Sequence, residues 1–161
     1  MTKVLGIVGW KDVGKTFFVT KIINLLVKKG YKVGTIKHAH HDFDIDKPGT
    51  DSFKHRQSGA SEVIISSSKR WAKIIENNNK TEKKLNELLR EFNDVDLVIV
   101  EGFKKENHPK IEIMGQNSKI VNSEIKNVVA IVADQKTKSN IPLFMRNDVE
   151  SLTEFIINKF L

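Results

Sequence analysis

The chain has 161 residues, a length that fits one domain with a hydrophobic core of its own. It contains no cysteine, which excludes a disulfide scaffold, a cysteine-ligated zinc site and thiol catalysis. The 27 Lys and Arg residues exceed the 20 Asp and Glu residues, giving a formal net charge of +7 that favours anionic partners such as nucleotides. No apolar run is long enough for a membrane span or a secretory signal, so a cytoplasmic protein without membrane contact is expected.

Strand and helix patterns alternate along the chain. The apolar run Val4–Val8 predicts a buried parallel strand, and the amphipathic stretch 16–29 predicts a helix that ends at Gly30. Alternating residues at 31–36 predict a second strand, and a short helix capped by Thr50 or Asp51 is expected to run to Ser58. Further strands are expected at 62–66, 70–76, 97–100, 110–114 and 128–132, and further helices at 83–92 and after Asp148.

An eight-residue motif joins the first strand to the first helix: Gly9, Trp10, Lys11, Asp12, Val13, Gly14, Lys15 and Thr16. It matches the phosphate-binding pattern GxxxxGK[ST] at every required position. The glycines let backbone N–H groups turn toward phosphate oxygens, Lys15 can reach the terminal phosphates, and the Thr16 hydroxyl can hold Mg²⁺. Together with the order of elements, the motif predicts an α/β fold: a single P-loop NTPase domain over residues 1–161, with three layers around a mostly parallel β-sheet.

A site of this type needs an acidic residue at the end of another apolar strand. Glu101 stands at the carboxyl end of the run 97–100, at the sheet edge where open α/β folds bind ligands. Asp96 stands at the other end of that run and is expected only to begin the strand. Glu101 is therefore the candidate Mg²⁺ ligand, although the acid in this position is usually Asp.

A segment rich in His and Asp, residues 37–49, follows the second predicted strand at the same edge. Its candidate functional residues are Lys37, His38, His41, Asp42 and Asp46. Three His and three Asp in this short stretch could ligate a transition metal. They could equally form a loop that responds to anions and Mg²⁺, or simply a solvated polar loop.

These motifs together resemble the molybdopterin-guanine dinucleotide biosynthesis adapter protein family, MobB. The resemblance covers nearly the whole chain and rests on GWKDVGKT, VGTIKHAHHDFDIDKPGTDSFKHRQSGA, SSSKRWAKI, DLVIVEGFKKENHPKIEI and the AIVAD strand before the last helix. It implies a GTP- and Mg²⁺-binding homodimer, with weak GTP hydrolysis at most. Such a protein assists a MobA-type guanylyltransferase in attaching GMP to molybdopterin.

The resemblance also extends the candidate site. It implies that Asp46, Asp51, His55 and Arg56 line a second, switch-like side of the nucleotide site, and that Thr16 and Glu101 serve Mg²⁺. Guanine preference likewise comes from the resemblance alone, because the chain has no NKxD guanine-recognition motif. The nearest candidate for base recognition is Asp134.

Three other functions remain open at this point. A nickel-type metal-insertion GTPase would use the histidines of the His-rich segment as metal ligands. The absence of cysteine disfavours this function, because proteins that transfer soft metal ions tend to bind them through thiolates. A P-loop small-molecule kinase would need an arginine-bearing lid, and the few arginines are not clustered. The net charge of +7 permits nucleic-acid binding, but no string of basic and aromatic residues supports it, so no nucleic-acid partner is expected.

Overall fold

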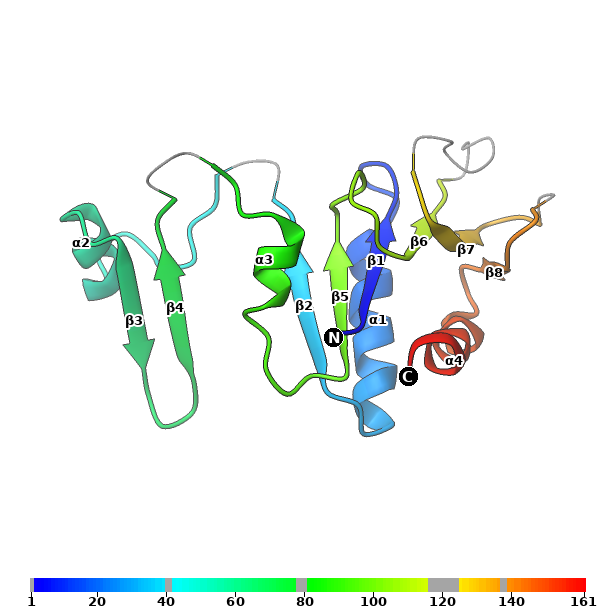
Figure 1. Ribbon diagram of the computed structural model, residues 1–161, viewed down its shortest axis with the longest axis horizontal. Coiled ribbons are helices and arrows are strands. Elements are labelled where there is room, and N and C mark those ends of the chain that lie inside the picture. The colour runs from blue at the N-terminus through cyan, green and yellow to red at the C-terminus, as the bar shows by residue number, and fades with distance from the viewer. Residues whose placement is uncertain (1, 40–41, 78–80, 116–124, 137–138) are drawn as a thin grey trace. The chain divides into compact units, whose positions relative to one another are not determined.

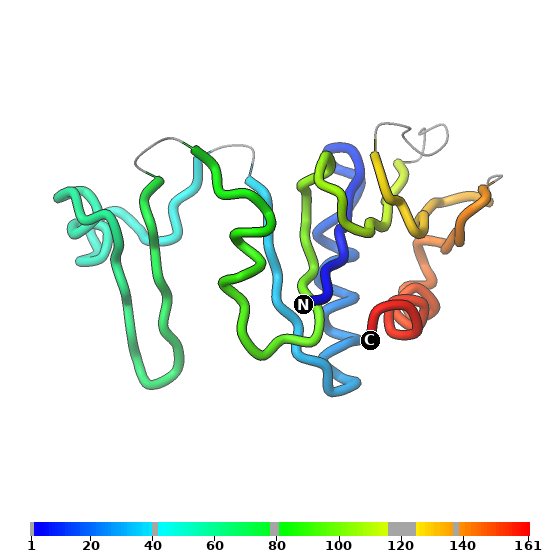
Figure 2. The backbone as a smooth tube through the Cα atoms, in the orientation of Figure 1, coloured from blue at the N-terminus to red at the C-terminus, as the bar shows by residue number. Residues whose placement is uncertain are grey.

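The computed structural model describes residues 2–39, 42–77, 81–115, 125–136 and 139–161 (Figures 1 and 2). The chain separates into two compact units, which are described one at a time. The first comprises Met1–His38 and Leu85–Leu161, and the second comprises Ala39–Lys84. The expectation of one nucleotide-binding domain over residues 1–161 stays a prediction.

The first unit is built on a six-stranded sheet with the order β2-β5-β1-β6-β7-β8, in which every neighbouring pair is parallel. The predicted α/β fold with a mostly parallel sheet is confirmed. Five strands lie where the apolar runs predict them, within a few residues, and β8 was not expected. The strands are β1 (Val4–Val8), β2 (Val33–Lys37), β5 (Leu97–Glu101), β6 (Lys110–Ile113), β7 (Val128–Ala133) and β8 (Leu143–Met145).

Helices cover both faces of this sheet (Figure 1). On one face, α1 (Lys15–Lys28) and α4 (Val149–Phe160) pack against alternate strand residues such as Leu97 and Ile99. On the other face, α3 (Leu85–Leu89) packs against the intervening residues Val98 and Val100. Successive side chains of a strand point to opposite faces, so strands apolar on both faces carry helices on both.

The helix ends follow the expected capping residues, with one difference in length. The Asp148 carboxylate accepts a hydrogen bond from the Ser151 N–H at the start of α4. The helix expected at 83–92 is shorter in the structure, because after Leu89 the chain continues in turns whose N–H groups bond three residues back. Phe92 nevertheless packs in the same apolar cluster as α3, which explains the longer periodic pattern.

The second unit contains α2 (Asp51–Gln57) and a two-stranded antiparallel sheet of β3 (Glu62–Ser66) and β4 (Trp71–Ile75). The Thr50 side chain caps α2 by accepting a hydrogen bond from the Phe53 N–H. Helix α2 packs against β3, and Val63 on this strand is buried. All three elements lie where the sequence predicts them.

Two polar side chains are buried where β6 begins. The Lys110 ammonium donates hydrogen bonds to the carbonyls of Glu106, His108 and Lys126. His108 packs against Gly6, where a Cβ would lie only 2.5 Å from the His108 Nε2. Within the described part of the chain, neither ring nitrogen of His108 has a hydrogen-bond partner. Burial, reinforced by the nearby Lys110 charge, lowers the pKa of His108 to about 4.

We predict that His108 makes the fold sensitive to mild acid. Above the ordinary histidine pKa of about 6.5, the side chain is neutral in both the folded and the unfolded chain. As pH falls from there to about 4, His108 becomes protonated in the unfolded chain but stays neutral in the folded chain. The free energy of unfolding therefore falls over this range. Urea unfolding at several pH values should show this slope in the wild type and less of it in His108→Leu. The exposed His55→Gln should keep the wild-type slope, and a His108→Leu slope equal to wild type would contradict the prediction.

Candidate functional site

The phosphate-binding motif forms the loop between β1 and α1, and its glycines occupy backbone conformations that other residues rarely adopt. Gly9 has φ +151°, and a Cβ there would lie 2.4 Å from the Ile113 carbonyl oxygen. Gly14 has φ +85° and caps α1 in the left-handed region. The loop can therefore wrap closely at the carboxyl end of β1, which leaves the first N–H groups of α1 available to an anion.

Lys15 lies at the centre of a group of cations around this loop. Its ammonium donates a hydrogen bond to the Trp10 carbonyl at 2.7 Å. The Lys104 ammonium lies 5.2 Å from the centroid of the exposed Trp10 ring. Partial burial, and next the Lys104 charge, lower the pKa of Lys15. An arriving phosphate would relieve this repulsion between like charges.

Thr16 and Glu101 meet at the carboxyl edge of the sheet. The Thr16 hydroxyl lies 3.1 and 3.2 Å from the two Glu101 carboxylate oxygens and donates to them. Lys37 extends from the end of β2 to within 3.9 Å of the same carboxylate. A hydroxyl and a carboxylate are oxygen ligands of the kind Mg²⁺ prefers, so this pair fits the metal role that the sequence predicts for it.

The end of β5 is locked to the end of β2 next to Glu101. The His38 N–H donates to the Glu101 carbonyl at 2.9 Å, and the His38 ring stacks on Phe103 with centroids 4.4 Å apart. Between them Gly102 has φ +107°, and a Cβ there would lie 2.7 Å from the His38 Cβ. His38 thus has a role in shaping the site, while the glycine and Phe103 were not singled out from the sequence.

Asp134, the candidate for base recognition, follows β7 at the same edge. Its carboxylate lies 3.2 Å from Arg146 Nε. Arg146 also donates to the Val13 carbonyl of the phosphate-binding loop at 2.9 Å. Sequence reasoning missed Arg146, because it follows the short β8 and belongs to no motif. Base recognition by Asp134 stays a prediction.

The remaining candidates belong to the second unit, where Arg56 is the central group. Its guanidinium pairs at 2.7 Å with each of three carboxylates, those of Asp44, Asp46 and Glu76. Asp46 is buried, and its hydrogen bonds from Arg56 hold the pKa of the Asp46 carboxyl below its usual range. Asp46 and Arg56 therefore tie the chain before α2 to the end of β4, an arrangement that the sequence did not predict.

Other candidates in this unit lie apart from that cluster. Asp42, Asp51 and His55 are exposed, and Asp51 pairs with Lys54 at 3.3 Å. His41 lies outside the described residues. Among the residues that are described, no group of three His, Asp or Glu side chains is arranged to hold a metal ion. No described helix has the length and apolar character needed to span a bilayer.

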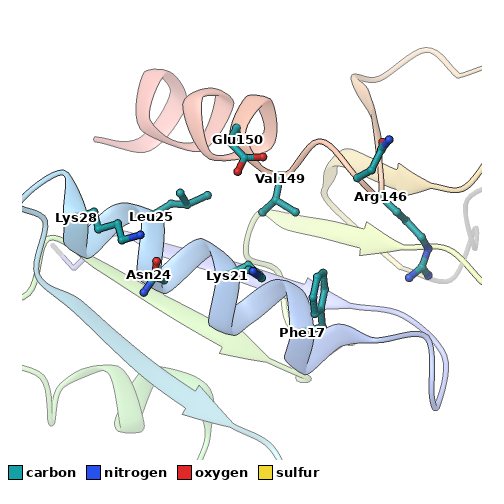
Figure 3. Close-up of a pocket in the computed structure, with 9 residues that line it drawn as sticks. Phe17, Lys21, Asn24, Leu25, Lys28, Arg146, Val149 and Glu150 are labelled. Carbon is teal, nitrogen blue, oxygen red and sulfur yellow. The ribbon is translucent and has the colours of Figure 1, made fainter.

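A groove of about 280 Å³ lies between α1 and α4, apart from Lys15 and Glu101 (Figure 3). Its walls include Phe17 and Lys21 of α1 and Glu150 of α4. Figure 3 shows Arg146 leaving the segment that precedes α4 and extending toward the ends of the strands. The groove itself mixes both charges and has no feature that selects a ligand.

The sequence profile of the family described as Molybdopterin guanine dinucleotide synthesis protein B, MobB, matches residues 4–134. The chain belongs to this family. It is 35% identical to the molybdopterin-guanine dinucleotide biosynthesis adapter protein of Escherichia coli K12, over 98% of this chain and 93% of that protein. The adapter protein of Haemophilus influenzae is 34% identical, over 96% of this chain and 87% of its own length.

Solved structures of MobB proteins share this fold. A crystal structure titled molybdopterin-guanine biosynthesis protein B aligns with a TM-score of 0.76 at 28% identity, covering 96% of this chain and 97% of that one. The crystal structure of Bacillus subtilis MobB aligns with a TM-score of 0.75 at 21% identity, covering 99% of this chain and 98% of that one. The fold around the phosphate-binding motif is therefore the fold of these MobB structures.

We predict that Glu101→Gln weakens the contribution of Mg²⁺ to nucleotide binding by about tenfold or more. The amide has one neutral oxygen where the carboxylate has two charged ones, and Mg²⁺ prefers the latter. Calorimetric titration of GTP with Mg²⁺ and with EDTA separates this contribution from binding of the nucleotide alone. Asp96→Asn is the matched control, because the Asp96 carboxylate accepts from the Lys32 N–H at the start of β5. A larger Mg²⁺ effect in Asp96→Asn than in Glu101→Gln would contradict the assignment.

Proposed function

We propose that this MobB-family protein is a GTP-binding adapter that assists a MobA-type guanylyltransferase in forming molybdopterin guanine dinucleotide. The main support for nucleotide binding is the hydrogen bond from Thr16 to Glu101, next to Lys15 of the phosphate-binding motif. Oxygen ligands for Mg²⁺ and a cationic phosphate site stand together there, as a Mg²⁺-nucleoside triphosphate requires.

The charge around the loop supports a polyphosphate ligand. Lys15, Lys37 and Lys104 come from three different strand ends or helix starts, while Glu101 is the acid that contacts Thr16. Four phosphate charges of GTP would meet these cations and the N–H groups of α1, and Mg²⁺ would offset the carboxylate. Slow GTP hydrolysis at most is expected, as the family resemblance implies.

The adapter part of the proposal rests on the family and on the names of its relatives. The relatives in Escherichia coli and Haemophilus influenzae are named as biosynthesis adapter proteins for molybdopterin-guanine dinucleotide. An adapter must engage a partner or its cofactor, so the proposed partners are the guanylyltransferase and molybdopterin or its guanine dinucleotide. Location in the cytoplasm, where such a synthesis would take place, is part of this proposal.

We predict that Lys15→Ala lowers GTP affinity by about a hundredfold or more while the fold is retained. The lost ammonium is the charge best placed to reach the terminal phosphates. Calorimetry with GTP and with ATP measures both affinity and base preference, and circular dichroism checks the fold. Lys28→Ala, an exposed cation in the last turn of α1, is the control for net charge. If the folded Lys15→Ala variant binds GTP with unchanged affinity, the proposed nucleotide binding is wrong.

A cofactor-forming assay tests the adapter role separately. Purified MobA-type transferase, molybdopterin and Mg²⁺-GTP are combined with and without this protein. Added wild-type protein is expected to increase the yield of molybdopterin guanine dinucleotide, and Lys15→Ala is expected to lose that effect. Equal yields with and without the wild-type protein would contradict the adapter role and leave the nucleotide site standing.

We also propose a homodimer, supported by an exposed apolar face in the second unit. In the register of β3 with β4, Ile64 opposes Lys73 and Ser66 opposes Trp71, so all four side chains lie on one face of the hairpin. The side chains of Ile64 and Trp71 are 64% and 69% exposed. A two-stranded sheet is marginally stable on its own, so burial of this face against a second copy would stabilise it.

The prediction is that Ile64→Glu combined with Trp71→Glu converts a dimer into a monomer. Two buried carboxylates without partners would oppose association strongly. Sedimentation equilibrium at several protein concentrations measures the dissociation constant. Val27→Glu places a carboxylate on an exposed apolar residue of α1 and should leave the wild-type dimer intact. A wild-type monomer at all concentrations, or an unchanged dimer in the double variant, would contradict this proposal.

A further inference from the structure

Arg146 connects the ends of four parallel strands at the nucleotide-binding edge. Its own N–H donates to the Ala133 carbonyl at the end of β7 at 3.2 Å, just after β8. Its Nη2 donates to the Met114 carbonyl after β6 at 2.6 Å, and to the Val13 carbonyl of the loop after β1 at 2.9 Å. The guanidinium therefore contacts the segments that follow β1 and β6, while the Arg146 backbone joins the ends of β8 and β7, so Arg146 links the sheet to the loop.

The guanidinium is itself held in place. The Asp134 carboxylate lies 3.2 Å from its Nε, and its Cζ lies 5.6 Å from the centroid of the buried Phe18 ring on α1. A Cβ on Gly14 would lie 3.5 Å from Arg146 Nη1, so the planar group packs alongside the backbone of that glycine. The side chain is about three-quarters buried, with an exposed fraction of 27%. Its contacts with Val13, Met114 and Asp134 therefore hold the guanidinium beside the phosphate-binding loop.

The contact with Val13 has a consequence for the next peptide N–H. In a planar trans peptide, the C=O of one residue and the N–H of the next point in opposite directions. A guanidinium that holds the Val13 carbonyl outward therefore turns the Gly14 N–H inward, away from Arg146. Gly14, with its positive φ, is the residue that permits this peptide orientation just before α1 begins.

We propose that Arg146 is a positioning residue of the phosphate-binding loop, which presets the Gly14 N–H as a donor to the nucleotide's phosphates by holding the Val13 carbonyl. The inference rests on the proposed nucleotide binding and names a determinant of it outside the motif. The Arg146–Asp134 pair then gives Asp134 a supporting role behind the loop. Preorganised donors bind an anion more tightly, because the loop need not reorder when the ligand arrives.

The test compares Arg146→Met, Arg146→Lys and Lys21→Met by calorimetry with GTP, GMP and guanosine. Lys21 lines the groove between α1 and α4, so its replacement removes a nearby charge without touching the loop. Arg146→Met is expected to lose about tenfold in GTP affinity, equivalent to about 1.4 kcal/mol, and to lose progressively less with GMP and guanosine. Arg146→Lys keeps one donor for a carbonyl and is expected to recover part of the loss, while Lys21→Met should resemble the wild type.

A spectroscopic measurement distinguishes positioning from general destabilisation. In ¹⁵N–¹H spectra of the ligand-free protein, Arg146→Met is expected to shift the Gly14 amide resonance and leave that of Gly30, at the far end of α1, in place. Wild-type GTP affinity in Arg146→Met, or an equal loss for all three ligands with an unmoved Gly14 resonance, would overturn the inference. Failure of the wild type to bind GTP would instead overturn the proposed function, so the two failures are distinguishable.

Discussion

The parallel pairing of β5 with β1 and β2 determines where the nucleotide-site residues meet. In this register, Glu101 lies opposite Ile7 on one side and Lys37 on the other. Alternation along β5 puts Glu101 on the same face as Leu97 and Ile99, which is the face that α1 covers. Thr16 in the first turn of α1 therefore lies above the carboxylate. A slip of one residue would turn Glu101 to the opposite face and separate it from Thr16.

Positive charges lie close together around the phosphate-binding motif. Lys15 is partly buried near Lys104, and both effects lower the pKa of its ammonium. The nearby Glu101 carboxylate accepts from the Thr16 hydroxyl and lies 3.9 Å from the Lys37 ammonium. Cations thus gather beside the first turn of α1, whose N–H groups have no partner within the helix, and both features favour an anionic ligand. This pattern of charges supports the proposal that the ligand is a Mg²⁺-nucleotide.

The second unit is organised on a different principle. Its ionic centre joins Arg56 to three carboxylates, of which Asp46 is buried while Asp44 is exposed and Glu76 is partly exposed to solvent, and these pairs order the chain around α2. The exposed Ile64 and Trp71 on the hairpin remain outside that centre. Exposed ion pairs contribute little to stability, and the desolvation of a buried pair offsets much of its attraction, so such a centre gives a defined geometry and little net stability. The unit would therefore gain most from covering its apolar face, which is the physical basis for the proposed dimer.

Local sequence patterns were enough to predict many of the secondary-structure elements and the phosphate-binding loop. Apolar runs predicted β1 and β5, side chains capable of capping predicted the starts of α2 and α4, and the glycine and lysine spacing predicted the phosphate-binding loop. Each of these depends on residues within a few positions of one another, so the printed sequence contains the necessary information. The family resemblance, carried by the same motifs, was confirmed by comparison with known proteins.

Only the tertiary structure decided which distant residues share a site. The contact of Thr16 with Glu101 spans 85 positions, and that of Arg146 with Val13 spans 133. The three-residue strand β8, which places Arg146, is too short to show a period of its own. Arg56 pairs with three carboxylates that lie up to twenty positions away, Asp44, Asp46 and Glu76, and no local pattern predicts these pairs. These contacts depend on strand order and register, which arise from packing the whole sheet and leave no local pattern in the sequence.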